Sequence, residues 1–352
     1  MRRALLTGAA VLVAVAAATA ATGCAGEKSD ADVSSDGGGS GKSNVPQVTF
    51  RYQSGASYGA VSPFELAQKL GYYDGTSVKI HSVGVSKSGP EDIQAIAAGS
   101  NDIASTNTAP IINANKSGLH IKAVVAYGTT VTKDLYGEEV SIGGLLTKRD
   151  SGISSAKDLE GKKVSVNVRS AQAEYAIRKW AQDNGADPSK INLVVIAPPN
   201  EVQALLQDQV DAAYSWNPAY SKAQEDPGVK LLAAEGEMLG DFAPGGYAFS
   251  QEFLDAHPEA VKEFLEGYVK AWKWAWDHPK ELQEKAAEII EDFDGNTELA
   301  QYAFPPGSRE AALLKDSDIQ FYIDQLIDQG DLKEGQIEPT DVYTNEFNPE
   351  AP

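Results

Sequence analysis

The sequence predicts an α/β fold made of two lobes, with two hinge crossings between them. From Val48 onward, short β-rich runs alternate with helical patterns, which is typical of α/β lobes with mainly parallel sheets. This alternation breaks at 148–151, restarts near Asp158 and breaks again at 245–249. About 300 residues follow Pro46, enough for two lobes with a sizeable core each. A chain that leaves one lobe, builds a second and returns encloses a cleft, and such clefts suit ligand capture by closure.

The first lobe is predicted to contain residues 46–148 and, after the return crossing, residues 248–352. Its first part reads as strands at 48–52, 77–83, 103–105, 120–126 and 142–147, and as helices at 63–70, 91–98 and 109–117. Gly71, Gly99 and Gly118 follow the three helical patterns, and glycine is favoured just beyond a helix. The return part is largely helical, with helices expected at 258–277, 280–292 and 317–329.

The second lobe is predicted to span residues 149–247. It reads as strands at 164–168, 193–196 and 211–215, and as helices at 171–184 and 201–209. Two glycines at 245–246 allow the sharp backbone change that the return crossing needs. In the long helix that follows, Tyr268, Trp272 and Trp276 repeat every four residues on one face. We expect this face to pack on the first lobe.

The only cysteine, Cys24, stands at the end of an apolar N-terminal run. Two arginines near the start form a short positive region, residues 4–21 carry no charge, and small residues precede Cys24, as a secretory signal requires. The arrangement resembles a bacterial lipoprotein signal, although Ala21 stands where that pattern usually has Leu. The resemblance implies a signal peptide at 1–23 and lipidation of Cys24, which becomes the mature N-terminus.

Two other interpretations of this segment stay open. The chain could be cut at the small residues 18–20 and released, or the segment could remain as an uncleaved anchor, although so many small residues barely span a bilayer. Residues 24–45 are mostly Gly, Ser, Asp and Lys and have almost nothing to bury. We therefore expect them to form a flexible tether between the membrane and the folded part.

Composition excludes several classes of function. The net charge of −20 at pH 7 and the lack of a basic run interleaved with aromatics exclude nucleic acid as a partner. If lipid occupies Cys24, the folded part has no thiol for a disulfide, a metal site or a nucleophile. The four histidines lack the paired spacing of a metal site; they are His81, His120, His257 and His278. No phosphate-binding or dinucleotide glycine loop is present, so we expect no enzyme, no metal and no cofactor.

Five polar turns are expected where a strand feeds a helix, at 53–55, 88–90, 107–110, 169–171 and 216–218. In open α/β sheets these strand ends face the ligand crevice. Unpaired N–H groups at helix starts, together with hydroxyl and amide side chains, form an anion-binding set. The candidate ligand-binding residues are Ser54, Gly55, Ser88, Thr108, Ser170, Ala171, Trp216 and Asn217.

Each turn also has a purely structural explanation. Ser, Thr and Asn before helices are normal caps, which contribute about 1 kcal/mol to stability. Ser170 lacks a strict capping box because Ala173 stands in the third position, so its hydroxyl could serve a ligand. Arg169 either faces the cleft as an anion partner or points to solvent. Trp216 is either an apolar wall for the ligand's carbon part or a core tryptophan.

The stretch 198–219, which contains Asp-Ala-Ala-Tyr-Ser-Trp-Asn-Pro from Asp211, resembles the second lobe of taurine- and alkanesulfonate-binding proteins of ABC importers. Residues 96–104 are similar to the helix-glycine-aspartate-strand segment of that family, and Thr108 lies where the family has a small polar pair before Pro. The resemblance covers nearly all of 48–343. It implies a two-lobed periplasmic-binding-protein fold of type II, with an anionic headgroup held between the lobes.

Carried over by position, the resemblance also implies site roles. The sulfonate would be surrounded by Ser54, Ser88, Thr108, Ser170 and Ala171, and Trp216 would contact the carbon chain. Two positions depart from the family pattern. Asn217 stands where taurine binders tend to have an Asp that pairs the ligand's amine, and Ala173 stands where a His is usual. Losing that carboxylate removes a charge-assisted bond of about 1.5 to 3 kcal/mol, which argues against strict taurine selectivity.

The leading interpretation is a monomeric solute receptor, exported and lipid-anchored to the outer face of the cell membrane. It would deliver a small anionic or zwitterionic solute, such as an alkanesulfonate or taurine, to ABC permease subunits. Nitrate and a pyrimidine precursor are the alternative solutes for the same fold. Pyrimidine-precursor synthases also resemble this fold, but such an enzyme would need cleft histidines and a cysteine-rich segment, and this chain has one cysteine. A scaffold lipoprotein without a ligand would have no use for five polar strand ends around one cleft.

Overall fold

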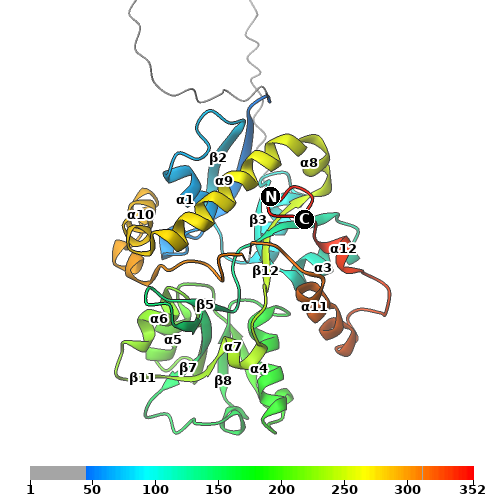
Figure 1. The fold of residues 1–352 in the computed structure, drawn as a ribbon. Helices are drawn as coiled ribbons and strands as arrows, with labels where there is room; N and C mark the ends of the chain where they lie inside the picture. The colour runs from blue at the N-terminus through cyan, green and yellow to red at the C-terminus, as the bar shows by residue number, and fades with distance from the viewer. Residues whose placement is uncertain (1–44, 311) are drawn as a thin grey trace, which may run out of the picture. The chain divides into compact units, whose positions relative to one another are not determined.

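The structure is a computed structural model that describes residues 45–310 and 312–352. Two sheet regions, each covered by helices, make up this part of the chain (Figure 1). The predicted signal peptide, Cys24 and the tether up to residue 44 lie outside the described residues. Within the described residues, no helix is both long enough and apolar enough to cross a membrane.

The first sheet region holds a parallel pair and a three-stranded sheet. Strands β1 (Val48–Ser54) and β2 (Val78–Val85) form the parallel pair. The three-stranded sheet has the order β3-β12-β4, built from β3 (Ala104–Asn107), β12 (Gly245–Ser250) and β4 (Ile121–Ala126). β12 runs antiparallel to both neighbours. Ile103, just before β3, donates its backbone N–H to the carbonyl of Arg51 in β1 at 3.0 Å, which brings the two parts of this region together.

The second sheet region is one five-stranded sheet in the order β11-β7-β10-β8-β9. Its strands are β7 (Gly143–Lys148), β8 (Lys163–Val166), β9 (Asn192–Val195), β10 (Ala212–Trp216) and β11 (Val229–Ala234). β8 is parallel to β9 and β10, whereas β7 is antiparallel to β10 and β11. The expectation of mainly parallel sheets was therefore wrong. The five-stranded sheet is mixed and the three-stranded sheet is antiparallel, because the strands that enter them from the other region, β7 and β12, run against their neighbours.

A small antiparallel hairpin and twelve helices complete the described part. The hairpin pairs β5 (Val131–Lys133) with β6 (Glu139–Ser141). The helices of the first region are α1 (Pro63–Lys69), α2 (Gly89–Ala97), α3 (Thr108–Lys116), α8 (Gln251–Ala256), α9 (Pro258–Asp277), α10 (Pro279–Asp292), α11 (Asp316–Asp328) and α12 (Pro339–Val342). Those of the second region are α4 (Gln172–Asp183), α5 (Glu201–Leu206), α6 (Ala219–Gln224) and α7 (Glu235–Leu239). Short 3-10 turns include η1 (Ala56–Tyr58), η2 (Ala156–Leu159), η3 (Pro188–Lys190) and η4 (Thr297–Tyr302).

The division into two lobes stays a prediction, but the sheets correct two of its expected boundaries. Residues 143–148 were expected in the first lobe, yet they form β7 and pair with β10 and β11. The charged break at 148–151 is a turn at the end of β7, where Ser151 donates its N–H to the Lys148 carbonyl. The first crossing therefore lies before Gly143. The return crossing is complete before Gly245, because Gly245 already pairs with Asn107 of β3.

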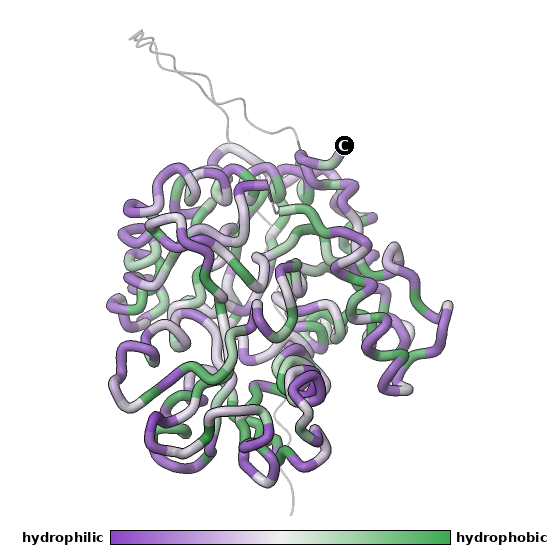
Figure 2. Tube along the Cα trace, turned by 60° about the horizontal axis from the view of Figure 1, so that its bottom comes forward, coloured by the Kyte–Doolittle hydropathy of each residue, from purple (hydrophilic) through white to green (hydrophobic). Residues whose placement is uncertain are grey.

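Helix α9 forms the centre of the core in the first region. Tyr268 and Trp272 have no exposed surface and pack with Phe50, Phe64 and Phe264. The hydroxyl of Tyr268 donates to the Ala126 carbonyl at 2.7 Å, so the buried phenol has a partner. Hydrophobic and hydrophilic residues alternate along the helices (Figure 2), as expected where one helix face is buried. The prediction that this aromatic face packs on the first region is confirmed.

Candidate ligand-binding site

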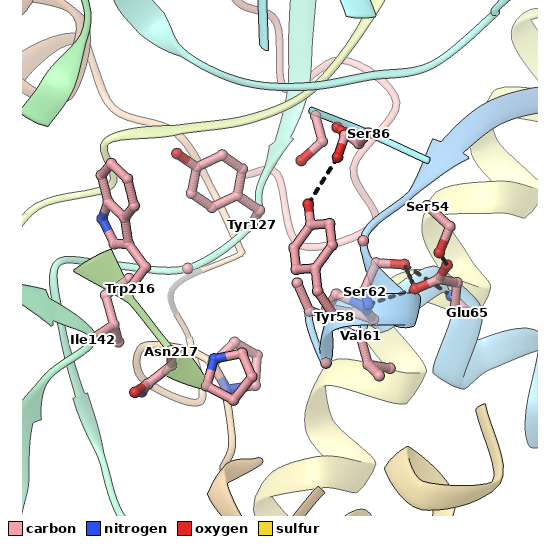
Figure 3. A pocket seen from close by; sticks show the side chains of 18 of the residues that line it. Ser54, Tyr58, Val61, Ser62, Glu65, Ser86, Tyr127, Ile142, Trp216 and Asn217 are labelled. Carbon is pink, nitrogen blue, oxygen red and sulfur yellow. Dashed lines mark hydrogen bonds between the residues drawn. The ribbon is translucent and has the colours of Figure 1, made fainter. Parts of the chain in front are cut away.

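A cavity of about 450 Å³ is lined by residues of both sheet regions. It lies where β1, β3 and β10 end and where α2 and α5 begin. Figure 3 shows Tyr58 and Trp216 on opposite sides of this pocket. Ligand sites of open α/β sheets occur at such strand ends, so the cavity is the candidate site.

Five of the eight predicted ligand-binding residues line this cavity. They are Ser54, Gly55, Ser88, Trp216 and Asn217. The five come from both sheet regions, so the structure brings together strand ends that lie far apart in the sequence.

The other three predicted residues do not line the cavity. Thr108 is buried, and its backbone N–H donates to the Pro244 carbonyl at 3.0 Å. Ala171 is buried as the residue that precedes α4. Ser170 is exposed, with φ of 56°, and its N–H donates to Glu174 at 3.0 Å. Contact of these three residues with a ligand stays a prediction that this geometry does not favour.

Of the two orientations expected for Arg169, toward the cleft or toward solvent, the structure shows the one toward solvent. Its guanidinium donates to both carboxylate oxygens of Glu174, at 2.7 and 3.0 Å, and half of its side chain is exposed. Burial raises the pKa of Glu174, but hydrogen bonds from Arg169, the Ser170 N–H and Arg178 outweigh it and lower that pKa to about 2. The sequence gives no sign that Glu174 would draw this turn away from the cavity.

The hydroxyl of Ser54 makes its hydrogen bonds within the protein. Its hydroxyl donates to Glu65 Oε1 and accepts from the Ala56 N–H, and the residue is 2% exposed. Glu65 also accepts from the Tyr52 hydroxyl and from both the N–H and the hydroxyl of Ser62, at 2.8 to 3.0 Å. Burial raises the pKa of Glu65 despite these hydrogen bonds. Ser54 therefore shapes the wall rather than offering a free hydroxyl.

Ser88 stands before α2 and keeps its side chain free of a capping hydrogen bond. Lys87, Ser88 and Gly89 all line the cavity at the start of this nine-residue helix. The first N–H groups of a helix have no partner within it, and the helix dipole adds positive potential there. This corner of the cavity therefore offers hydrogen-bond donors and one ammonium group to an anion.

Behind this corner lies a buried acid. Asp92 Oδ2 accepts from the Ser86 hydroxyl at 3.0 Å and from the Ser105 N–H at 3.2 Å, whereas its Oδ1 has no partner. Burial raises the pKa of Asp92 to about 7. Tyr58 covers the same corner, since its hydroxyl donates to the Ser86 carbonyl at 3.1 Å (Figure 3).

Trp216 is held from behind by Glu235. The indole N–H donates to Glu235 Oε1 at 3.2 Å, and the side chain of Gln172 donates to the same oxygen. Glu235 has no exposed surface, and its Oε2 has no partner. Burial raises the pKa of Glu235 to about 7, against the hydrogen bonds from Trp216 and Gln172. Trp216 therefore serves as a cavity wall whose orientation a buried acid fixes.

Glu201 and Asn217 line the cavity from the second region. Glu201 is the first residue of α5, is 2% exposed, and has an Oε2 without a partner. Burial raises its pKa to about 7. Asn217 accepts from the Ser221 hydroxyl through Oδ1 at 2.5 Å, and its Nδ2 is without a partner. The unpaired polar atom of Asn217 is thus a donor rather than an acceptor.

Several cavity residues were not among the eight candidates, including Tyr58, Lys87, Tyr127 and Glu201. Glu201 reads as an ordinary acid in the first turn of a helix, and only its 2% exposure separates it from such residues. Among the described residues that line the cavity, Lys87 is the single basic side chain. In the ranges 45–310 and 312–352, no three His, Cys, Asp or Glu side chains gather closely enough to hold a metal ion.

A family model described as NMT1/THI5 like matches residues 60–282, more than half of the chain. The chain belongs to this family.

Individual relatives of this NMT1/THI5-like chain are distant aliphatic-sulfonate- and taurine-binding proteins. It is 24% identical over 234 residues to a protein of Bacillus subtilis (strain 168) whose name provisionally assigns it to the binding of aliphatic sulfonates. That match covers 65% of this chain and 67% of the relative. It is 26% identical over 184 residues to the taurine-binding periplasmic protein of Escherichia coli (strain K12), covering 52% of this chain and 54% of the relative. The chain thus spans about two thirds of the first relative and about half of the second.

Solved structures share the fold of this NMT1/THI5-like chain at low identity. The alkanesulfonate-binding protein SsuA from Xanthomonas axonopodis pv. citri, bound to MOPS, matches with a TM-score of 0.64 and 18% identity, over 86% of this chain and 99% of that chain. The nitrate-binding protein NrtA from Synechocystis PCC 6803 matches with a TM-score of 0.67 and 14% identity, over 86% and 87%. The desulfurization enzyme DszB matches with a TM-score of 0.57 and 15% identity, over 85% and 97%. The fold is therefore the α/β periplasmic-binding-protein fold, as predicted.

Proposed function

We propose that this protein is the extracytoplasmic solute-binding component of an ABC importer, and that it binds a small organic anion or zwitterion, such as an alkanesulfonate or taurine. The observation that carries the proposal is the cavity of about 450 Å³ lined by strand ends of both sheet regions. The distant relatives named for sulfonate and taurine binding support the solute class.

In this proposal the anionic end of the solute lies at the start of α2. The free Ser88 side chain, the first N–H groups of the helix and the Lys87 ammonium are the donors available there. The carbon part of the solute packs against Trp216 and Tyr58, whose rings stand on opposite sides of the pocket (Figure 3). Anion binding by mostly neutral donors suits a protein with a net charge of −20, because local donors decide affinity inside a cavity.

The N-terminal pattern supports export and anchoring. We propose lipidation at Cys24, which would hold the monomeric receptor at the outer face of the membrane, within reach of its permease subunits. The relative from Escherichia coli carries the word periplasmic in its name, which supports an extracytoplasmic location.

Two alternatives are less well supported by the described residues. Nitrate has four non-hydrogen atoms, and a cavity of about 450 Å³ offers room for on the order of fifteen waters at about 30 Å³ each. An enzyme of the DszB kind shares the fold, but residues 25–352 of this chain contain no cysteine nucleophile. A pyrimidine precursor would fit by size and stays an outcome of the test.

Thermal unfolding of the exported protein with a panel of solutes tests the proposal. The panel contains ethanesulfonate, taurine, nitrate and a 4-aminopyrimidine. A ligand at 100 times its dissociation constant adds about 2.7 kcal/mol of stability, which raises the melting temperature by several degrees. We expect at least one sulfonate to do so. A shift with nitrate or the aminopyrimidine alone, or with none of the four compounds, would reject the sulfonate class.

A further inference from the structure

Among the buried side-chain atoms of the residues that line the cavity, more acceptors than donors are unpaired. Three buried side-chain oxygens of the lining residues accept no hydrogen bond: Glu201 Oε2, Asn107 Oδ1 and Asn167 Oδ1. One buried donor of the lining residues, Nδ2 of Asn217, is equally unpaired. Buried polar groups of folded proteins are normally hydrogen-bonded, so this wall fits a solute that itself carries N–H donors.

Glu201 is the strongest of these acceptors. It is 2% exposed and lines the cavity, and no hydrogen bond reaches its Oε2. Leaving an ionised carboxylate buried without a partner is costly, whereas an ammonium group in hydrogen-bond contact offsets that cost. An anionic solute placed against Glu201 would instead add repulsion between like charges.

The charge of Glu201 acts on a residue of the other sheet region. Its negative charge, with those of Asp92 and Glu65, adds to the burial that raises the pKa of the Tyr58 hydroxyl. Tyr58 belongs to η1 in the first sheet region, whereas Glu201 starts α5 in the second. The acid of one region therefore lies within electrostatic reach of the opposite wall.

Donors gather at another part of the same cavity. Lys87, Ser88 and Gly89 line it at the start of α2, and the Ser88 side chain makes no capping hydrogen bond. The cavity consequently has a donor-rich end on the first region and an acid on the second. A solute of one charge sign satisfies only one of these ends.

We propose that the solute is a zwitterion whose protonated amine donates to Glu201 while its anionic group lies at the start of α2. This inference rests on the proposed function and narrows it from organic anions in general to amine-bearing ones. Asn217, the residue that the resemblance pointed to for the amine, uses its Oδ1 to accept from Ser221, and only its Nδ2, a donor, is unpaired.

Calorimetry with three sulfonates on one three-carbon chain tests the inference. The probes are propane-1-sulfonate, 3-aminopropane-1-sulfonate and 3-(trimethylammonio)propane-1-sulfonate, which differ in having no cation, a cation with N–H donors and a cation without them. We expect the amino compound to bind wild-type protein at least about tenfold more tightly than either of the others, because it alone can donate to Glu201. This comparison needs no variant.

The variant Glu201→Gln tests whether Glu201 causes the preference for the amino compound. We expect the advantage of the amino compound over propane-1-sulfonate to fall to within about threefold, because the charge-assisted bond is lost. Glu284→Gln is the matched control, since Glu284 is an exposed residue of α10 that does not line the cavity. It should keep the wild-type preference.

Each failure has a distinct meaning. If propane-1-sulfonate or the trimethylammonio compound binds wild-type protein as tightly as the amino compound, the inference is overturned while the proposed function stands. The same holds if Glu201→Gln folds and keeps the tenfold preference. If none of the three sulfonates binds, the proposed function fails and the inference fails with it.

Discussion

The indole N–H of Trp216 donates to Oε1 of Glu235 at 3.2 Å, and the amide of Gln172 donates to the same oxygen. Trp216 and Gln172 line the cavity, whereas Glu235 lies behind them without exposed surface. Two cavity side chains thus share one buried acceptor. Glu235 starts α7, a few residues before the return crossing, so the chain that leaves the second region also sets the orientation of its cavity wall.

Replacement of Glu235 should separate its positioning role from its charge. Glu235→Leu removes the acceptor of both Trp216 and Gln172, so we expect solute affinity to fall about tenfold or more and the free energy of unfolding to fall by about 1 to 3 kcal/mol. Glu235→Gln keeps a carbonyl oxygen at that place and should change affinity by less than about threefold. Calorimetry with taurine and urea unfolding measure both effects. Wild-type affinity in Glu235→Leu would show that solute binding does not depend on the hydrogen bond from Trp216 to Glu235.

Three buried acids should make the ligand-free protein less stable as the pH rises above about 4.5. Burial raises the pKa of Asp92, Glu201 and Glu235 to about 7. Between about pH 4.5 and 7 the folded state therefore holds protons that the unfolded state has lost, so the free energy of unfolding falls with rising pH. The slope is about 1.4 kcal/mol per pH unit for each such group.

The opposite sign applies to Glu174, whose pKa is lowered to about 2. Its stabilisation is present above about pH 4.5 and is lost as the pH falls below that value. Urea unfolding between pH 3 and pH 8 should therefore show maximal stability near pH 4.5, and Glu235→Gln should flatten the decline between pH 5 and 7. A stability that rises between pH 5 and 7 would contradict the raised pKa values.

We expect the lack of a side chain at Gly59 to let the two sheet regions lie close together. A Cβ on Gly59 would lie 2.5 Å from Pro218 Cγ, just after β10, and 3.0 Å from Leu299 Cβ. The residue has φ of 91°, so Gly59→Ala adds both backbone strain and this contact. We expect solute affinity to fall about tenfold or more, because the arrangement that encloses the cavity is disfavoured.

Gly99→Ala is the control for the strain alone. Gly99 has φ of 72°, and a Cβ there would meet nothing within 4 Å. This variant should lose about 1 kcal/mol of stability and keep its affinity. Equal loss of affinity in both variants would show that strain, and not contact with Pro218, is responsible.

Lipidation at Cys24 predicts a change in location. Cys24→Ser should release the protein from the membrane fraction or leave the precursor uncut, because the sulfur that carries the lipid is gone. Fractionation and the mass of the mature chain measure this. Unchanged membrane association together with an unchanged mass would reject the lipoprotein interpretation in favour of an uncleaved anchor.

Local patterns were sufficient to predict much of the fold. The strand of Val48, the helix that begins at Pro63 and the aromatic face of α9 all depend on nearby residues, and all are confirmed. The lobe boundary at 148 was wrong because the partners of β7 lie 65–73 and 81–90 residues further along the chain, where no local pattern indicates them. The prediction of mainly parallel strands was wrong for the same reason, because strand direction depends on where β7 and β12 enter their sheets.

The residues of the candidate site also fall into those that local sequence predicted and those that it did not. Ser88 and Asn217 follow strands and Trp216 ends one, and position at a strand end was enough to place them at the cavity. Ser170 has the same sequence signal, but the ion pair of Arg169 with Glu174 draws its turn to the surface. Glu201 carries no sequence signal beyond its position in a first turn, because its role depends on burial by residues that lie far away in the chain.

A crystal structure of the protein with 3-aminopropane-1-sulfonate tests the central claim most directly. We predict that the solute lies in the cavity between Tyr58 and Trp216, with its sulfonate at the start of α2 and its nitrogen within about 3.2 Å of Glu201 Oε2. A solute bound outside this cavity, or one with its sulfonate turned toward Glu201, would contradict the account.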